Sequence, residues 1–420
     1  MADREDAFRA PKGTNDILPP ASWWWERARR RAEDIFATSG YAPVETPMFE
    51  NTEVFERGVG QATEVVTKQM YTFSDLGGRS LTLRPEGTAP VVRAMLEKNL
   101  HRGALPIKLY YAGWMFRQER PQKGRYRQFF QVGIEAIGSD AARADAEVVW
   151  LGAHFIRSMG VEPTVHLNSI GHPDESCRGG YIKILVAFLD EHRDELAADD
   201  RERISTNPLR TFDSKEASTI AVMEGAPLIA DHLCDACRKH FEAVQQDLRN
   251  VGIAFTLAPR LVRGLDYYTR TAFEYTAGGL GSQDAIGGGG RYDGLAEALG
   301  GPHVPGIGFA LGIDRLRLAA GEPEVDQHPV DVYIVALGED AGRRSFELAT
   351  RLRTAGVGAD LDLMGRGLKG QMKDADRSGA RWAVILGEDE MASGNATIRD
   401  LTTGEQRTAA FDEVEAELTR

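Results

Sequence analysis

The order of apolar and polar residues divides the chain into a strand-rich first part, a helical middle and a regular α/β end. Apolar residues recur at helical spacing from Ser22 to Gly40, which predicts an opening helix with Ser22 as its N-cap. The residues expected to face the core from this helix are Trp25, Ala28, Ala32, Ile35 and Phe36. Strand-like patterns follow at 41–49, 80–84, 108–116 and 127–138. The last two follow each other without a helix between them, so we expect an antiparallel sheet.

A second group of patterns predicts the rest of the architecture. Residues 85–88 indicate a turn that caps a helix, and charged helical segments dominate from about residue 172 to residue 255, where we expect a helical insertion. Strand patterns return at 271–276, 284–290 and 306–310, and a helix is predicted at 312–320. After a polar, proline-containing linker at 321–329, strands and helices alternate. We therefore expect an α+β first domain at 1–325, with an antiparallel sheet flanked by helices, and a small α/β domain at 330–420.

Composition narrows the class of protein. The chain has 420 residues, of which 42% are hydrophobic and 27% charged, so it can bury the cores of two or three domains. It contains no apolar run of about 18 residues, and its acidic start does not resemble a signal or transit peptide, so we expect no membrane span. Three cysteines exclude a disulfide framework and favour a reduced, cytoplasmic protein. The net charge of −13 argues against general DNA binding.

The strongest local signal for chemistry is a basic segment at 108–127. It holds six lysines and arginines against the single acid Glu119, with aromatic residues between them. In so acidic a chain, this concentration predicts a site for phosphates of a nucleotide or of RNA. The alternative is a solvated, charged hairpin tip.

The strand after this segment has a polar face. Phe129, Gln131, Gly133 and Glu135 alternate with apolar residues, so an amide and a carboxylate lie on the same side with a glycine between them. The glycine would let a ligand approach the sheet closely, and the polar pair could bind a small zwitterion. The alternative is an exposed strand face, and the pattern alone does not decide between them.

Three further clusters could contact a ligand. Residues 263–268 combine Arg263, a glycine and the phenols Tyr267 and Tyr268, a set that could hold an anionic and aromatic substrate. The glycines at 287–290 remove side chains where a flat ligand could lie on a strand. Arg315 is expected in the first turn of a helix after Gly312, where backbone N–H groups favour phosphate. For residues 263–268, the alternative is the start of a strand with tyrosines in the core. For the glycines at 287–290 it is a plain loop, and for Arg315 it is a position on the surface.

Two motifs are weaker. Residues 365–370 match the glycine spacing of dinucleotide-binding loops, with Glu388 about twenty residues further on, but they lie at the second step of the domain rather than the first. Cys234 and Cys237, flanked by His232 and His240, resemble half of a zinc site. Cys177 is distant in sequence, so we expect buried or redox-silent thiols and assign no metal ligand.

Together, these segments resemble the histidyl-tRNA synthetases, a family of class II aminoacyl-tRNA synthetases. The resemblance covers nearly the whole chain. It rests on TLRPEGT at 82–88, MFRQERPQKGRYRQF at 115–129 and LVRGLDYY at 261–268. Thr46-Pro47 resembles motif 1 of class II enzymes, which lies at the dimer interface in the family, and residues 308–315 resemble motif 3.

The resemblance implies a reaction and a role for each cluster. The family activates L-histidine with ATP and transfers it to tRNA(His). It implies that Arg117, Arg263 and Arg315 are catalytic, and that Arg117, Arg315 and Gly312 bind ATP, with Mg²⁺ on the leaving pyrophosphate. The residues implied to bind histidine are Glu86, Thr88, Gln131, Glu135, Arg263, Tyr267 and Tyr268. Those implied to meet the acceptor end of the tRNA are Arg120, Gln122 and Arg125.

The resemblance also implies a homodimer and an anticodon-binding role for the C-terminal domain. Departures from the family pattern are few: Asp314 replaces a common glutamate, Phe130 and Gln118 stand where histidine is frequent, and Ile286 stands where some members have cysteine. The main alternative is a regulatory paralogue from histidine biosynthesis that keeps the fold without catalysis. Such paralogues lack the C-terminal domain and lose the adenylation arginines, all of which are present here.

Overall fold

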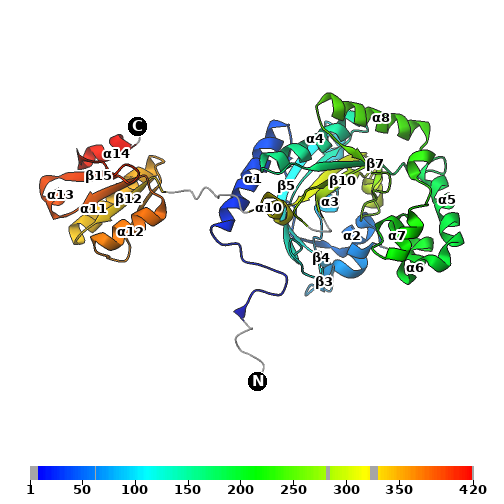
Figure 1. The fold of residues 1–420 in the computed structure, drawn as a ribbon, viewed down its shortest axis with the longest axis horizontal. Coiled ribbons are helices and arrows are strands. Elements are labelled where there is room, and N and C mark those ends of the chain that lie inside the picture. The colour runs from blue at the N-terminus through cyan, green and yellow to red at the C-terminus, as the bar shows by residue number, and fades with distance from the viewer. Residues whose placement is uncertain (1–7, 62, 281–283, 322–329, 419–420) are drawn as a thin grey trace, which may run out of the picture. The chain divides into compact units, whose positions relative to one another are not determined.

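The computed structural model describes residues 8–61, 63–280, 284–321 and 330–418. The chain divides into two compact units, the first built from most of the described residues up to Gly321 and the second chiefly from residues 330–418 (Figure 1). Apart from Gly321, the predicted linker lies outside the described residues. None of the helices in the described ranges combines the length and apolar character needed to span a bilayer.

An eight-stranded sheet forms the centre of the first unit. Its order is β1-β5-β6-β11-β10-β9-β7-β8. The strands are β1 (Ala42–Pro43), β5 (Ile107–Phe116), β6 (Gln128–Ile137), β7 (Thr164–Ser169), β8 (Thr256–Leu257), β9 (Thr269–Thr276), β10 (Ala285–Arg291) and β11 (Gly306–Gly312). All central pairs are antiparallel, as predicted, and the two edge strands pair in parallel with β5 and β7. The expected α+β class is confirmed, with a sheet that is mixed at its edges.

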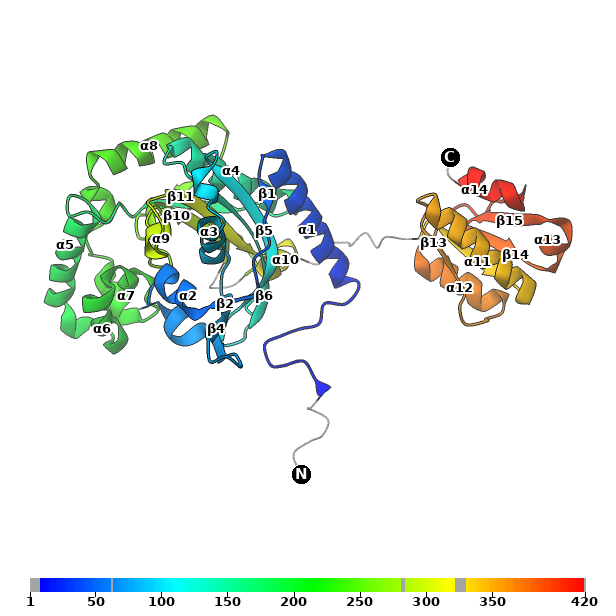
Figure 2. The ribbon, with the colours of Figure 1, turned by 180° about the vertical axis from the view of Figure 1, so that it is seen from behind.

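Helices α1 (Ala21–Thr38) and α4 (Ala142–Ser158) cover one face of this sheet (Figure 2). Phe36 of α1 lies with its ring centroid about 6 Å from those of Tyr110 on β5 and Phe155 on α4. The predicted apolar face of β6 is buried here. Two details of the predicted first helix were wrong, because it begins before Ser22 and buries Trp24 rather than Trp25.

The other face carries α3 (Thr88–Glu97), α9 (Leu295–Ala298) and a small sheet. Residues of α3 pack on Tyr111 and Met115 of β5 to form a core cluster. The small sheet has the order β2-β4-β3, and α2 (Thr52–Val59) follows its first strand. Its strands are β2 (Phe49–Asn51), β3 (Tyr71–Ser74) and β4 (Ser80–Leu83). The predicted turn at 85–88 brings the chain from β4 into α3.

Helices α5 to α8 lie along one side of the first unit (Figure 1). They are α5 (Arg178–Glu191), α6 (Ala198–Thr206), α7 (Ala217–Met223) and α8 (Asp235–Asn250). Their core includes Tyr181, Leu185, Leu189 and Cys237, and it reaches Tyr268 and Ala272 at the start of β9. This helical region therefore shares a core with the sheet.

The second unit contains a five-stranded sheet with the order β13-β12-β14-β15-β16. Its strands are β12 (Val332–Ala336), β13 (Ala359–Leu361), β14 (Trp382–Leu386), β15 (Asn395–Asp400) and β16 (Gln406–Ala410), and its helices are α11 (Glu339–Thr354), α12 (Leu368–Ser378), α13 (Glu388–Ser393) and α14 (Val414–Leu418). The first three strands are parallel, as the alternating pattern predicted, and the last two add an antiparallel edge. The glycine segment at 365–370 leads into α12, and Arg366 there pairs with Asp362 at 3.2 Å.

Candidate active site

A cavity of about 350 Å³ lies on the α3 side of the first unit's sheet, and most of the predicted site residues line it. They come from four separate parts of the chain, which the fold brings together. The predicted residues in the lining are Glu86, Thr88, Arg117, Arg125, Gln131, Arg263, Tyr267, Tyr268, Gly312 and Arg315. The predicted residues outside it are Glu135, Arg120 and Gln122.

Arg117 is positioned directly after β5, at the start of the basic loop. Its Nε donates a hydrogen bond to the carbonyl of Pro85 at 2.9 Å, and its guanidinium lies 5.3 Å from the ring centroid of Phe129. Its Nη1 is 3.6 Å from the Glu119 carboxylate, a distance at which the ion pair is loose. The backbone contact and the ring therefore fix the guanidinium while leaving donors available to an anion.

Arg263 enters from the segment before β9. Its Nη1 donates to Glu274 at 2.7 Å, and its guanidinium lies 5.9 Å from the ring of Tyr268. Its Nε is buried and has no hydrogen-bond partner within the described part of the chain. A buried donor without a partner is costly, so it is a position where a ligand oxygen would be favourable.

Arg315 lies in the first turn of α10 (Ile313–Ala320), as the sequence predicted. Its Nε donates to the carbonyl of Ala285 on β10, and the aliphatic part of its side chain lies beside Gly124 of the basic loop. Burial, together with the nearby positive charge of Arg125, lowers the pKa of Arg315. Two cations held close together in a cavity favour a bound anion between them.

Glu86 and Thr88 begin helix α3. The Glu86 carboxylate accepts hydrogen bonds from the backbone N–H groups of Thr88 and Ala89, both at 2.8 Å, and the Tyr267 hydroxyl lies 3.4 Å from it. Burial raises the pKa of Glu86 even though these N–H groups favour its ionised form. The carboxylate thus caps the helix and still faces the cavity.

Glu135 lies beneath the cavity floor. Its side chain is fully buried and accepts hydrogen bonds from the hydroxyls of Tyr292 at 2.6 Å and Thr88 at 2.7 Å, with the Tyr111 hydroxyl at 3.5 Å. Burial raises its pKa to about 8. β6 places Glu135 on the predicted polar face, but it does not line the cavity and instead contacts Thr88, which does.

Gln131 occupies the same face of β6 as Glu135. It lies opposite Gly312 in the register of β6 with β11, and both residues line the cavity. The Gln131 Oε1 atom is buried and has no hydrogen-bond partner in the described ranges. An orphaned amide acceptor beside an open cavity is suited to a ligand N–H.

The four glycines of β10 have two different functions. Gly287 and Gly288 line the cavity, as expected of positions where a ligand lies on the strand. Gly289 and Gly290 do not line it, and a Cβ at Gly290 would lie 2.8 Å from the ring of Tyr268. At all four positions a Cβ would come closer than 3 Å to a backbone carbonyl oxygen, so the absence of a side chain also allows close packing within the sheet.

The basic loop connects β5 to β6. Gln122 and Arg125 pair through their backbones at 3.1 and 2.9 Å, which closes the loop tip. Arg125 faces the cavity, whereas Arg120 and Gln122 are exposed on the loop. The loop therefore presents polar donors both to the cavity and to a larger partner outside it.

Several residues of the site were missed by the sequence analysis. Glu274 on β9 pairs with Arg263, and Tyr111 and Tyr292 contact Glu135, but none of these residues stands out in a local pattern. A buried network was also missed: Asp145 accepts from Arg291 at 2.8 Å and from Thr271 at 2.6 Å. Pairing of such distant residues has no signal in a single sequence.

His240 belongs to this buried network rather than to a metal site. Its Nε2 lies 2.8 Å from the Asp145 carboxylate. His232 packs on the ring of Tyr181, with ring centroids 5.6 Å apart.

Comparisons with known proteins agree with this geometry. The family model "Histidyl-tRNA synthetase" matches residues 13–175 and 186–316, and the model "Anticodon binding domain" matches residues 331–420. A histidine–tRNA ligase of Halothermothrix orenii is 49% identical over 402 residues, covering 95% of this chain and 96% of that protein.

Solved structures give the same result. The structure of apo histidyl-tRNA synthetase from S. aureus is similar with a TM-score of 0.83 and 38% identity, covering 98% of this chain and all of that one. A structure titled as an ATP phosphoribosyltransferase regulatory subunit/histidyl-tRNA synthetase from Bacillus halodurans shares the fold, with a TM-score of 0.63, 23% identity and coverage of 90% and 98%. The chain belongs to the histidyl-tRNA synthetase family.

Proposed function

We propose that this protein is a histidine–tRNA ligase, which activates L-histidine with ATP and transfers it to the 3′ end of tRNA(His). The observation that carries the proposal is the meeting of Arg117, Arg263 and Arg315 at one cavity, in a chain that is 49% identical to a histidine–tRNA ligase over nearly its full length. Three arginines from separate segments are the donors that a polyphosphate and a carboxylate require.

In the first step, a carboxylate oxygen of histidine attacks the α-phosphorus of ATP. The bond from that phosphorus to the bridging oxygen breaks, and pyrophosphate leaves with the electron pair. Histidine's carboxylate is ionised near neutral pH, so no general base is needed. Catalysis then depends on positioning and on neutralising the charge that develops at the α-phosphate.

The arginines divide this work by their positions. Arg117, fixed by Pro85, binds the α-phosphate, and Arg315 at the start of α10 binds the γ-phosphate beside Gly312. Arg263 offers its unpaired Nε to the carboxylate and α-phosphate oxygens from the opposite side. Each guanidinium presents several donors in a fixed plane, which suits phosphate oxygens.

Mg²⁺ is the expected companion of ATP here. Glu119 lies 3.6 Å from both Arg117 and Arg125 and lines the cavity, so the site contains a carboxylate of the type that Mg²⁺ prefers. When bound with ATP, the ion supplies positive charge at the departing pyrophosphate.

Recognition of histidine rests on the polar residues of β6, α3 and the segment before β9. Glu86, Thr88 and Gln131 are placed to bind the amino and carboxylate groups, and Tyr268 with Tyr267 lies beside the imidazole position. Glu135 holds the Thr88 hydroxyl from below at 2.7 Å. A neutral imidazole has one donor and one acceptor, and a site that pairs both rejects analogues lacking them.

The second step and its partner involve other surfaces. A ribose hydroxyl at the tRNA 3′ end attacks the carbonyl of the adenylate, and AMP leaves. We infer that Arg120, Gln122 and Arg125 of the basic loop bind the acceptor end, and that residues 331–420 bind the anticodon. The match of these residues to an anticodon-binding family supports the second assignment and replaces the dinucleotide hypothesis.

We also infer a homodimer that works in the cytoplasm. Near Thr46-Pro47, the side chains of Met48, Phe49 and Phe73 remain between 43% and 51% exposed in the single chain. Clustered exposed apolar side chains are typical of a surface that a second copy covers. The regulatory paralogue is disfavoured because the catalytic arginines and residues 331–420 are present.

The test is ATP–pyrophosphate exchange with each amino acid in turn. We expect exchange with histidine, and a loss of at least about 100-fold in Arg263→Gln, because one charge-stabilising group at the reacting centre is removed. Arg260→Gln is the matched control, since Arg260 is exposed, lies outside the cavity lining, and donates to the carbonyl of Glu224 at 2.6 Å. A folded protein silent with histidine but active with another amino acid would refute the assignment.

A further inference from the structure

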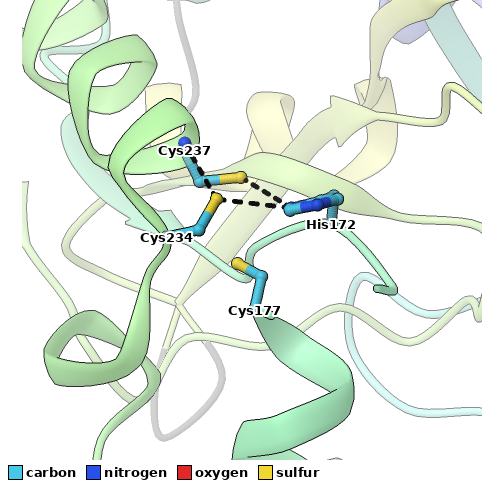
Figure 3. A group of neighbouring side chains, drawn as sticks. All are labelled: His172, Cys177, Cys234 and Cys237. Carbon is cyan, nitrogen blue, oxygen red and sulfur yellow. Dashed lines mark hydrogen bonds between the residues drawn. The ribbon is translucent and has the colours of Figure 1, made fainter. Parts of the chain in front are cut away.

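Four side chains that the active site does not use meet where the helical region joins the sheet. His172 and Cys177 lie in the segment between β7 and α5, while Cys234 and Cys237 lie at the start of α8 (Figure 3). The two pairs are about sixty residues apart in sequence. Cys177 is distant in sequence from the other two cysteines, and no local pattern points to His172.

The distances within this cluster suit a small metal ion. The four nearest ligand atoms all lie within 4.8 Å of one another. Nδ1 of His172 is 3.1 Å from Sγ of Cys237 and 3.7 Å from Sγ of Cys234. In a tetrahedral site with metal–ligand distances of about 2.0–2.3 Å, ligand atoms lie roughly 3.3–3.8 Å apart, so little movement is needed.

The histidine ring is already oriented for coordination. Its Nε2 lies 2.9 Å from the carboxylate of Asp174, and its Nδ1 points toward the sulfur atoms (Figure 3). A carboxylate on one ring nitrogen holds the proton there and leaves the lone pair of the other nitrogen for a metal. This is the arrangement that accompanies histidine ligands in metal proteins.

The backbone also accommodates the cluster. The N–H of Cys237 donates to Sγ of Cys234 at 3.5 Å, at the N-terminus of α8, where a thiolate is stabilised. Gly171 has a φ of +62°, and a Cβ there would lie only 2.7 Å from Sγ of Cys177. The loop can wrap closely around the sulfur atoms because this position has no side chain.

We propose that His172, Cys177, Cys234 and Cys237 form a structural zinc site. Binding converts three thiols to thiolates, releases three protons to solvent and leaves a complex with one net negative charge. The guanidinium of Arg178, the residue that follows Cys177, is expected to balance that charge. Three thiolates and one imidazole around a closed tetrahedron select zinc over magnesium or calcium.

The zinc site would stabilise the proposed histidine pocket through backbone contacts with residues beside that pocket. Nη1 of Arg178 donates to the carbonyl of Tyr268 at 2.7 Å, and the carbonyl of Gly171 accepts from the N–H of Arg270 at 2.8 Å. The metal cross-links the segment at 171–178 to α8, so it fixes the loop on which these two contacts depend. Zinc is thus expected to position Tyr268 without contacting substrate.

The test is metal analysis of the full-length protein purified under reducing conditions without chelators. We expect about one zinc per chain, falling below about a tenth in a Cys234→Ser/Cys237→Ser variant. Cobalt added to the reduced, metal-stripped protein should give the visible d–d bands of a tetrahedral site and thiolate charge-transfer absorption. His232→Asn, which removes a neighbouring histidine outside the cluster, is the control and should retain the metal.

A variant that keeps all four ligands allows the proposal to be tested even if a cysteine variant folds poorly. Gly171→Ala, which leaves all four ligands intact, should weaken zinc binding at least about tenfold in competition with a chromophoric chelator, because its methyl group would displace Cys177. The proposal is overturned if the native protein holds no zinc and its reduced form shows no cobalt spectrum. Retention of zinc by the double cysteine variant, or a Cys234–Cys237 disulfide in metal-free native protein, would also overturn it.

Discussion

Glu135 lies outside the cavity lining but is hydrogen-bonded to Thr88, which lines it. The hydroxyls of Thr88, Tyr111 and Tyr292 surround its carboxyl group, which has no exposure to solvent. Burial raises the pKa of Glu135 to about 8, so a large fraction of the molecules carry a neutral carboxyl group near neutral pH. Protonation of Glu135 changes which of the surrounding hydroxyl groups donate hydrogen bonds to it. It therefore changes the hydrogen bonding that the Thr88 hydroxyl can offer to the cavity.

We predict that Glu135 makes stability depend on pH. A carboxyl group with a raised pKa in the folded state contributes stability that is fully present below about pH 4.5 and is lost as the pH rises through about 8. In Glu135→Gln this dependence should be absent, so the variant should gain stability relative to the native protein between about pH 5 and 8. Urea unfolding at a series of pH values measures the effect.

Glu242→Gln, at an exposed position on α8, is the control and should follow the native curve. Parallel pH profiles of native protein and Glu135→Gln would contradict the buried, neutral carboxyl group.

Histidine-dependent exchange by Glu135→Ala should show a raised KM for histidine while the chain stays folded. Unchanged kinetics would remove Glu135 from any part in histidine binding.

For single residues, the sequence was informative where the chemically relevant side chains lie close together along the chain. It singled out the residues of the polar strand face and Arg117, because period and charge density are visible in a short window, whereas the shared role of the three arginines came from the family resemblance. It did not show that Glu135 lies beneath Thr88, because that depends on hydroxyls from 47 and 157 residues away. It also gave no sign of His172, because the contacts of His172 with Cys234 and Cys237 join residues that are 62 and 65 positions apart.

Strand β10 illustrates how an element can be shaped by close packing. It lies between β9 and β11 in the middle of the sheet and has four consecutive glycines. A Cβ at Gly288 would meet the carbonyl of Phe273 and lie 2.9 Å from Nη1 of Arg263. The missing side chain therefore makes room for the arginine that the proposed reaction requires.

We predict that Gly288→Ala displaces Arg263 and lowers histidine-dependent pyrophosphate exchange at least about tenfold, with a stability loss of roughly 1–3 kcal/mol from overpacking. Exchange kinetics and denaturant unfolding measure the two effects. Gly294→Ala is the matched control, because a Cβ at Gly294 meets nothing within 4 Å and its φ of −93° is ordinary. Equal activity of the two variants would contradict this interpretation of β10.

Many elements of the chain were predicted with errors of a few residues at their ends, but the strand predicted at 41–49 is two short strands, β1 and β2, near the ends of that range. Strands β5 and β6 and helices α11 and α12 have strong periodicity and were identified directly. Helix α4, strand β7 and the antiparallel edge of β15 and β16 were missed. Strand β7 is only six residues long, and the burial of nine residues around α4 weakens the amphipathic pattern.

At the scale of the whole molecule, the exposed apolar surface near β2 and β3 is the feature that a single chain does not explain. The rings of Phe49 and Phe73 pack edge to face with centroids 6.3 Å apart, and both remain partly exposed. Burying such a surface between two copies would stabilise the assembly by about 25 cal/mol for each Å² of apolar area.

We predict that Phe49→Arg converts a dimer into monomers at micromolar concentration, because it places a charge in the proposed apolar interface. Light scattering coupled to size-exclusion chromatography measures the mass. Ile220→Arg, at a similarly exposed apolar position on α7, should remain dimeric. A native protein with the mass of one chain would contradict the dimer.

The contacts of Glu135 also bear on the order in which the molecule acquires its activity during folding. Its partners come from α3, β5 and the end of β10, so its buried carboxyl group is satisfied only after segments separated by up to 157 residues have met. Closing such long loops is slow compared with forming helices. We therefore expect the pocket to be among the last features to mature, so that a nascent chain with most of its helices formed would still be unable to select its amino acid.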